Sequence, residues 1–233
     1  MSVQPVEAAD CSIVRSEQPL LGYAAAMVAP ILAVHPDHPQ PRVIGRAVAA
    51  LREGELVAYP TDSYYGLGCD LGSKRAIDRL YQLKGYDRKR TMSLLVPDLS
   101  EVSRYAKVSN FGYRVLKHLA PGPFTFVLEA TRLVPEIMQT KQRTVGLRIS
   151  EHPVAHALCE ALGRPLVTTS ASKDGEVLIG AGELRDAFGH GLALVLDGGP
   201  QESAPSTVLS LVDDQVVVLR QGKGDASALV TQG

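Results

Sequence analysis

Residues 59–69, YPTDSYYGLGC, follow a short apolar segment, residues 55–59 (ELVAY), that has the pattern of a strand. They gather hydroxyl groups, one carboxylate and two glycines into one turn. A loop of this kind can present the hydroxyls of Thr61 and Ser63, together with bare backbone amides, to a polar ligand. A Pro/Gly turn that joins two strands has the same composition, so composition alone leaves both interpretations open.

Strand and helix patterns alternate around this loop. The chain lacks the regular strand–helix repeats and the glycine-rich fingerprint of a doubly wound nucleotide fold, and it closes with a hairpin pattern. It therefore predicts a mixed α/β fold, a single twisted sheet of parallel and antiparallel strands with flanking helices. The predicted strands are 31–35, 55–59, 93–96, 123–130, 145–149, 165–170, 192–196, 206–211 and 215–220; the predicted helices are 43–51, one from Ser73 to Lys84, 98–105, 109–119, 153–162 and 181–188.

The composition is that of a globular protein. The 233 residues are 45% hydrophobic, which is enough for one large domain. We expect a weakly ordered N-terminal extension at 1–28, the domain at 29–223 and a C-terminal tail at 224–233. The three cysteines form no CxxC pair or disulfide framework, which favours a reducing compartment. The apolar stretch at 23–34 is too short to span a bilayer, so we predict a cytoplasmic protein without a membrane partner.

The net charge of −1 hides an uneven distribution. Residues 74–148 hold 15 Lys and Arg against 6 Asp and Glu, a net charge of +9, while the remainder holds 9 against 19, a net charge of −10. A basic middle between acidic flanks suggests a local anion site for a nucleotide, a phosphate or an RNA backbone. A basic surface without a ligand is the alternative.

A basic run occupies residues 84–90, KGYDRKR, after a predicted helix. Cations at a helix C-terminus interact favourably with the helix dipole, but four exceed that need. We expect some of them, among Lys84, Arg88 and Arg90, to meet phosphate. A solvated charge run is the competing interpretation.

A row of hydroxyls occupies residues 168–172, TTSAS, at the end of a predicted buried strand. Because side chains alternate along a strand, residues 168, 170 and 172 point to one side. Polar groups at the C-terminal end of a strand are typical of ligand sites in open α/β sheets, although a Ser/Thr-rich loop entry looks the same. Without a GxSxG or SxxK motif, serine-based acyl transfer has no support.

Two arginines end otherwise apolar strands, Arg148 in VGLRI and Arg220 in VVVLR. Such a charge must be paired with a carboxylate or face a cleft. A third pattern, His152, His156 and Cys159, has i, i+4, i+7 spacing that can ligate zinc. Apolar residues occupy the opposite side of that helix, so we expect this trio to form a surface face and predict no metal site.

Seven motifs in order resemble the YrdC family of L-threonylcarbamoyladenylate synthases and their relatives. The resemblance runs from about Leu32 to Arg220, and residues 33–48 together with the basic loop look most like the YciO branch. The matching motifs are YPTDSYYGLGCD (59–70), the helix ending at Lys84, PGPFTFVLEA (121–130), TVGLRIS (144–150), PLVTTSAS (165–172), PSTVLS (205–210) and VLRQG (218–222).

The resemblance implies a concave, basic cavity on an α/β sheet. It also implies condensation of threonine, bicarbonate and ATP, with Mg²⁺, into threonylcarbamoyl-AMP and pyrophosphate for the t⁶A modification of tRNA. In this reaction the protein mainly positions reactants and neutralises phosphate charge. The resemblance assigns catalytic roles to Lys84 and Ser170, and binding roles to Thr61, Ser63, Tyr65, Arg148, Ser206 and Arg220. We also expect Arg88 and Arg90 of the basic run, and Ser172 of the hydroxyl row, to bind the nucleotide or the substrate.

Two positions depart from the family pattern. The synthases carry Lys-x-Arg and Ser-x-Asn, whereas this chain has Tyr86 and Ser172 at the third positions. A phenol lacks the permanent charge and bidentate fork of a guanidinium, and a hydroxyl lacks the paired donor and acceptor of an amide. The hypothesis is a synthase of weak or altered activity. The alternative is a protein that binds RNA or a nucleotide without chemistry, although 5% aromatics without Trp offer few surfaces for stacking bases.

Overall fold

The computed structural model of the protein describes residues 28–87, 90–202 and 204–227. Of the expected N-terminal extension, residues 1–27 lie outside this range, and Val28 is exposed. The start of the expected C-terminal tail packs on the domain, since Ala226 is buried and the Thr207 hydroxyl donates to the Gly224 carbonyl at 2.6 Å. None of the helices in the described ranges is long and apolar enough to cross a bilayer.

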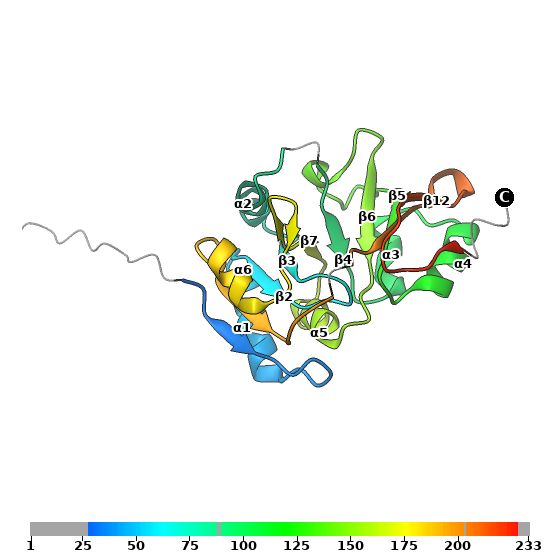
Figure 1. Ribbon diagram of the computed structural model, residues 1–233. Helices are drawn as coiled ribbons and strands as arrows, with labels where there is room; N and C mark the ends of the chain where they lie inside the picture. The colour runs from blue at the N-terminus through cyan, green and yellow to red at the C-terminus, as the bar shows by residue number, and fades with distance from the viewer. Residues whose placement is uncertain (1–27, 88–89, 203, 228–233) are drawn as a thin grey trace, which may run out of the picture.

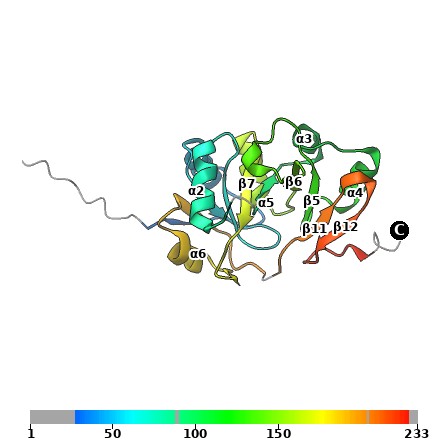
Figure 2. The same cartoon turned by 90° about the horizontal axis from the view of Figure 1, so that it is seen from above.

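A mixed sheet runs across the whole molecule (Figures 1 and 2). Within the described residues it has ten strands in the order β1-β10-β2-β3-β7-β4-β6-β5-β11-β12. Parallel and antiparallel neighbours alternate irregularly along it, which confirms the predicted fold class. The strands are β1 (Ile31–Ala33), β2 (Val57–Tyr59), β3 (Gly66–Asp70), β4 (Ser93–Leu95), β5 (Phe124–Glu129), β6 (Thr144–Arg148), β7 (Leu166–Ser170), β10 (Leu194–Asp197), β11 (Thr207–Ser210) and β12 (Val217–Arg220).

Helices pack on both faces of the sheet. Side chains alternate between two cores: in β10, Val195 enters one, while Leu194 and Leu196 enter the other. The larger core receives α2 (Lys74–Lys84), α3 (Leu99–Tyr105), α4 (Asn110–Leu119) and α6 (Ala181–Phe188). The smaller core receives α1 (Pro41–Arg52) and α5 (Pro153–Leu162), which lie against each other (Figure 1).

The smaller core covers only part of its sheet face. Tyr59, Leu95 and Leu166 still lie under α1 and α5. Ser93 lies two residues before Leu95 in β4, and Thr168 lies two residues after Leu166 in β7. Both are on the same face of the sheet and pair directly across the two antiparallel strands. The sheet face therefore changes from apolar to polar where the helical cover ends.

Local signals explain most element boundaries. The Ser73 hydroxyl accepts from the Ala76 amide and starts α2, and Gly85 ends it in the left-handed conformation at φ 61°. The expected hairpin forms between β11 and β12, joined by a short 3₁₀ turn (Val212–Asp214). A second 3₁₀ turn (Glu136–Met138) lies between β5 and β6.

One strand of the large sheet and a separate small hairpin were not predicted. The second half of the 59–69 motif is strand β3, which pairs with both β2 and β7, so the turn does join two strands. A small hairpin, β8 (Ser172–Lys173) with β9 (Glu176–Val177), follows β7. The expected surface trio on α5 was wrong in one member, because Cys159 is 1% exposed and lies in the core, where burial raises its pKa to about 12.

Candidate functional site: a basic basin on the open sheet face

A cavity of about 450 Å³ lies on the uncovered part of the sheet face. We call it the basin. Among the described residues its lining contains three arginines, Arg90, Arg148 and Arg220, and eleven side chains that carry a hydroxyl, but no Asp or Glu. This lining is suited to a polyanion. The hydroxyl residues are Tyr64, Tyr86, Thr91, Ser93, Thr125, Thr140, Thr168, Thr169, Ser170, Ser172 and Ser206.

Strand register builds the floor of the basin. Ser93 of β4 pairs with Thr168 of β7 on one side and with Gly146 of β6 on the other. A Cβ atom on Gly146 would lie 2.8 Å from the Ser93 hydroxyl oxygen and 3.3 Å from the Thr125 methyl carbon. The bare backbone of β6 therefore leaves the floor open at this point.

Arg148 is the buried cation of the basin and is only 9% exposed. Its Nη2 donates to the Asp62 carboxylate, to the Ser63 hydroxyl at 2.8 Å and to the Thr61 hydroxyl at 3.3 Å. Its Nε has no hydrogen-bond partner within the described part of the chain. An unpaired buried donor is costly, so a ligand that accepts a hydrogen bond from it would be stabilised.

The turn after β2 holds Arg148 from behind the basin. Asp62 also accepts from the Glu151 amide at 3.2 Å, which links this turn to the segment after β6. Thr61 donates to the Tyr64 carbonyl at 2.5 Å. The turn thus joins two strands and positions a cation at the same time, and the ion pair expected as the structural alternative for Arg148 is present.

Arg220 and Ser206 form the wall on the side of β11 and β12. The guanidinium of Arg220 donates to the Ser206 carbonyl at 2.8 Å, and the Ser206 hydroxyl bonds Thr125 at 2.9 Å. Partial burial lowers the pKa of Arg220, and the nearby charges of Arg148 and Arg90 lower it further. The Arg220 guanidinium therefore lies close enough to those of Arg148 and Arg90 to be repelled by them, and an anion in the basin relieves this repulsion.

Lys84 lies beside the basin, in an adjoining cavity of about 580 Å³ that shares Tyr86, Arg90, Ser172 and Gly175 with it. Its ammonium donates to the carbonyls of Ser170, at 3.1 Å, and of Ser172. Partial burial lowers the pKa of Lys84. This ammonium fixes the start of the β8–β9 hairpin, and reaching a ligand requires it to give up these carbonyls.

The structure brings six of the eleven predicted site residues into the basin lining. These are Arg90, Arg148, Ser170, Ser172, Ser206 and Arg220. Thr61 and Ser63 contact Arg148, and Lys84 lines the adjoining cavity. Tyr65 is buried in the larger core, where its hydroxyl donates to the Gly199 carbonyl at 2.8 Å. Arg88 lies outside the described residues.

Sequence reasoning missed the neighbour of Tyr65 and part of the floor. Tyr64, not Tyr65, lines the basin, because the chain enters β3 after it and the side chains alternate from there. Ser93 and Thr125 also line it. Ser93 is the single polar residue of SLLV, and Thr125 is the single polar residue of PFTFVL, and that signal could have identified them.

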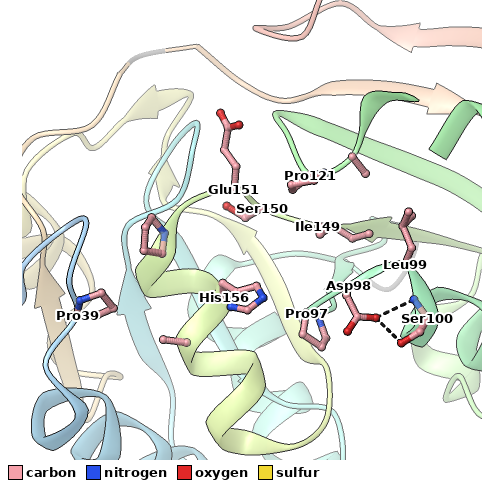
Figure 3. A pocket seen from close by; sticks show the side chains of 13 residues that line it. Pro39, Pro97, Asp98, Leu99, Ser100, Pro121, Ile149, Ser150, Glu151 and His156 are labelled. Atoms are coloured by element: carbon pink, nitrogen blue, oxygen red, sulfur yellow. Dashed lines mark hydrogen bonds between the residues drawn. The ribbon is translucent and has the colours of Figure 1, made fainter. Parts of the chain in front are cut away.

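A larger cavity of about 920 Å³ has a different character (Figure 3). Prolines from four segments and other apolar side chains form most of its lining, together with Asp98, Glu151 and His156. The Asp98 carboxylate is already bonded to the Ser100 amide at 2.7 Å, at the start of α3 (Figure 3). The lining of this cavity contains no Lys or Arg among the described residues, so the cavity does not suit an anion.

The donor set does not fit Mg²⁺ held by the protein. Magnesium sites use one or two carboxylates beside substrate phosphates. The described lining of the basin offers no carboxylate, and Asp62 behind it is paired with Arg148. Groups of three or more potential metal ligands are absent from the described part of the chain. No catalytic step is therefore assigned to a metal.

Comparison with known proteins supplies the family. The Sua5_yciO_yrdC family, described as "Telomere recombination", matches residues 49–222. The chain belongs to the Sua5/YciO/YrdC family. The match includes β2 to β12 and so contains every residue that lines the basin.

Relatives with two different names are similar to most of the chain. The uncharacterized protein YciO of Escherichia coli is 39% identical over 195 residues, which cover 82% of this chain and 95% of that protein. Its crystal structure superimposes with a TM-score of 0.83 at 37% identity, over 86% of this chain and 99% of that chain. A threonylcarbamoyl-AMP synthase of Vibrio vulnificus is 31% identical over 76% of this chain and 97% of that protein.

A second solved structure bears on the ligand. The crystal structure of P. abyssi Sua5 complexed with L-threonine superimposes with a TM-score of 0.77 at 29% identity, over 82% of this chain and 57% of that chain. The family resemblance drawn from the motifs is thus confirmed, including the similarity to YciO.

Proposed function

We propose that the protein is an ATP-dependent enzyme of the threonylcarbamoyl-AMP synthase type, acting in the cytoplasm on threonine and bicarbonate for tRNA t⁶A modification. The observation that carries the proposal is the basin itself: three guanidinium groups, no carboxylate among its described lining residues, and a buried Arg148 with an unpaired donor. The identity to named synthases and the threonine complex of Sua5 support the choice of substrates.

The chemistry requires positioning more than acid–base groups. Threonine and bicarbonate condense to a carbamate with loss of water. A carbamate oxygen then attacks the α-phosphorus of ATP; the bond between this phosphorus and the oxygen that bridges it to the β-phosphorus breaks, and pyrophosphate leaves. Arg148, Arg90 and Arg220 offset the phosphate charge, which is greatest as the bond breaks. The hydroxyls of Ser170 and Ser206 orient the reactants.

The same residues predict slow turnover. Tyr86 and Ser172 line the basin where the synthases carry arginine and asparagine. Lys84 holds the carbonyls of Ser170 and Ser172 and is not in the basin lining. Of the charged groups in the family pattern, the arginine is replaced by Tyr86, and Lys84 is hydrogen-bonded to backbone carbonyls. We therefore expect a rate of pyrophosphate release well below that of a full synthase.

Titration calorimetry with MgATP, with and without threonine and bicarbonate, tests the proposal. Wild-type protein should bind MgATP, and Arg148→Met should lose binding, whereas Arg46→Ala, an exposed arginine on α1, should bind like wild type. Lys84→Ala reports whether the ammonium leaves its carbonyls for the ligand. Absence of ATP binding, together with a salt-sensitive affinity for RNA, would refute the enzyme and favour an RNA-binding protein.

A further inference from the structure

Tyr86 and Arg90 form a stacked pair at the border between the basin and the adjoining cavity. The central carbon of the Arg90 guanidinium lies 4.2 Å from the centre of the Tyr86 ring. Both residues line both cavities. This distance is well within the range at which an arginine is attracted to the face of an aromatic ring.

The backbone fixes both partners of this pair. The Tyr86 amide donates to the Tyr81 carbonyl at 3.1 Å, directly after the left-handed Gly85 that ends α2, and the ring packs against the larger core. The Arg90 amide donates to the Asp87 carbonyl at 3.1 Å and to its carboxylate at 3.2 Å. The ring is thus a fixed platform, while the arginine is otherwise an exposed side chain.

An unsupported exposed arginine samples many rotamers and loses that freedom when it binds a ligand. Stacking on a fixed ring restricts Arg90 beforehand, and the planar guanidinium keeps its edge donors available because the ring occupies only a face. Arg90 lines the basin together with Arg148 and Arg220. Burial is the main cause of the lowered pKa of Arg220, and the charge of Arg90 contributes to it. Arg90 therefore faces the same ligand volume as the other two guanidinium groups.

We propose that Arg90, held by stacking on Tyr86, binds the phosphates of the nucleoside triphosphate, and that Tyr86 is its positioning residue. The inference rests on the proposed function. Tyr86 stands where the family pattern has an arginine, and its ring supports Arg90, which lies four residues later in the chain. A guanidinium group is therefore still present at the border of the basin.

The test measures the affinities of single and double variants for MgATP and for magnesium tripolyphosphate. Arg90→Ala should weaken both about 10- to 100-fold, the loss expected for charge-assisted hydrogen bonds. Tyr86→Leu should weaken both about two- to fivefold, while Tyr86→Phe should keep the wild-type affinity. Arg46→Ala is the matched control for loss of one positive charge, and its affinity should not change.

A double-mutant cycle separates positioning from a structural role. If Tyr86 acts through Arg90, Tyr86→Leu has no further effect in the Arg90→Ala background. Tyr86→Arg combined with Arg90→Ala should recover affinity relative to Arg90→Ala, because the new guanidinium starts from a backbone position at the same border of the basin. In steady-state assays of pyrophosphate release, Arg90→Ala should raise KM for ATP and leave KM for threonine unchanged.

Each contrary result overturns a defined part of the proposal. Wild-type affinity of Arg90→Ala for both probes would refute the role of Arg90. Equal effects of Tyr86→Leu in the presence and absence of Arg90 would refute positioning by Tyr86. A wild-type protein that binds tripolyphosphate but not ATP would refute the proposed function, while the Arg90 variants are still judged on tripolyphosphate; binding of neither would refute both.

Discussion

Replacing Asp62 by asparagine should lower stability and raise anion affinity at the same time. The Asp62 side chain is 4% exposed and that of Arg148 is 11% exposed, so their ion pair is shielded from water. Removing one member of a buried pair destabilises a protein by about 3–5 kcal/mol. Asparagine keeps an oxygen that can accept from Arg148 and from the Glu151 amide, so we expect about 2 kcal/mol and a fall in Tm of about 4–8 °C.

The gain in affinity comes from the same carboxylate. The Asp62 carboxylate offsets the positive charge of Arg148. Without that carboxylate, an anion in the basin interacts with the full charge of Arg148. Across about 8 Å at an effective dielectric of 20, one charge interacts with another by about 2 kcal/mol, and salt reduces this. Asp62→Asn should therefore bind inorganic pyrophosphate roughly three- to tenfold more tightly than wild type.

Thermal unfolding and pyrophosphate titration measure the two effects. Asp186→Asn is the control, because its ion pair with Arg185 is exposed and such pairs contribute less than about 1 kcal/mol. An unchanged Tm for Asp62→Asn would show that the pair does not stabilise the turn. A lower Tm accompanied by weaker pyrophosphate binding would show that Asp62 acts on the ligand through loop geometry, not through charge, and would refute the reasoning.

Three further predictions concern the floor, a helix start and the thiols. Gly146→Ala should weaken MgATP binding with little loss of secondary structure, since its Cβ would displace the Ser93 hydroxyl; unchanged affinity in titration would contradict an open floor. His152, which accepts from the Val154 amide, has a pKa lowered by burial, so the unfolded chain binds more protons and stability is lost as pH falls below about 6.5. His152→Asn keeps an acceptor and should flatten this acid limb in urea unfolding from pH 5 to 8, whereas parallel profiles would refute the assignment. Because burial raises the pKa of the Cys69 and Cys159 thiols, iodoacetamide at pH 8 should label them only after denaturation, as followed by peptide mass spectrometry.

Local patterns in the sequence were sufficient for the helices. Caps such as Ser73 and Gly85, and apolar residues at helical spacing, act over a few residues and are visible in the chain. Strand β3 was missed because GLGCD has no alternation: it is buried on both sides between β2 and β7, and its glycines avoid the ring of Tyr59. Strand order depends on partners far away in the chain, so local composition does not determine it.

The site was predicted in its chemistry but only partly in its geometry. The isolated charges at Arg148 and Arg220 pointed to the basin because an apolar strand rarely ends in an unpaired cation. The orientation of Tyr65 and Lys84 could not be read in the same way. The Tyr65 hydroxyl donates to the Gly199 carbonyl, and the Lys84 ammonium donates to the Ser170 carbonyl. Both carbonyls belong to segments more than 80 residues away in the chain, so local sequence does not reveal these contacts.

The order of strands also has a consequence for biosynthesis. Strand β10 inserts between β1 and β2, and β11 pairs with β5. Neither end of the sheet can therefore form until the last part of the chain has been synthesised. A nascent chain that has passed α5 still exposes the open edges of β2 and β5, which are the kind of surface that chaperones shield. Ser206 and Arg220 arrive last, so a ribosome-bound or prematurely terminated product that stops before β11 lacks the basin wall that these two residues form.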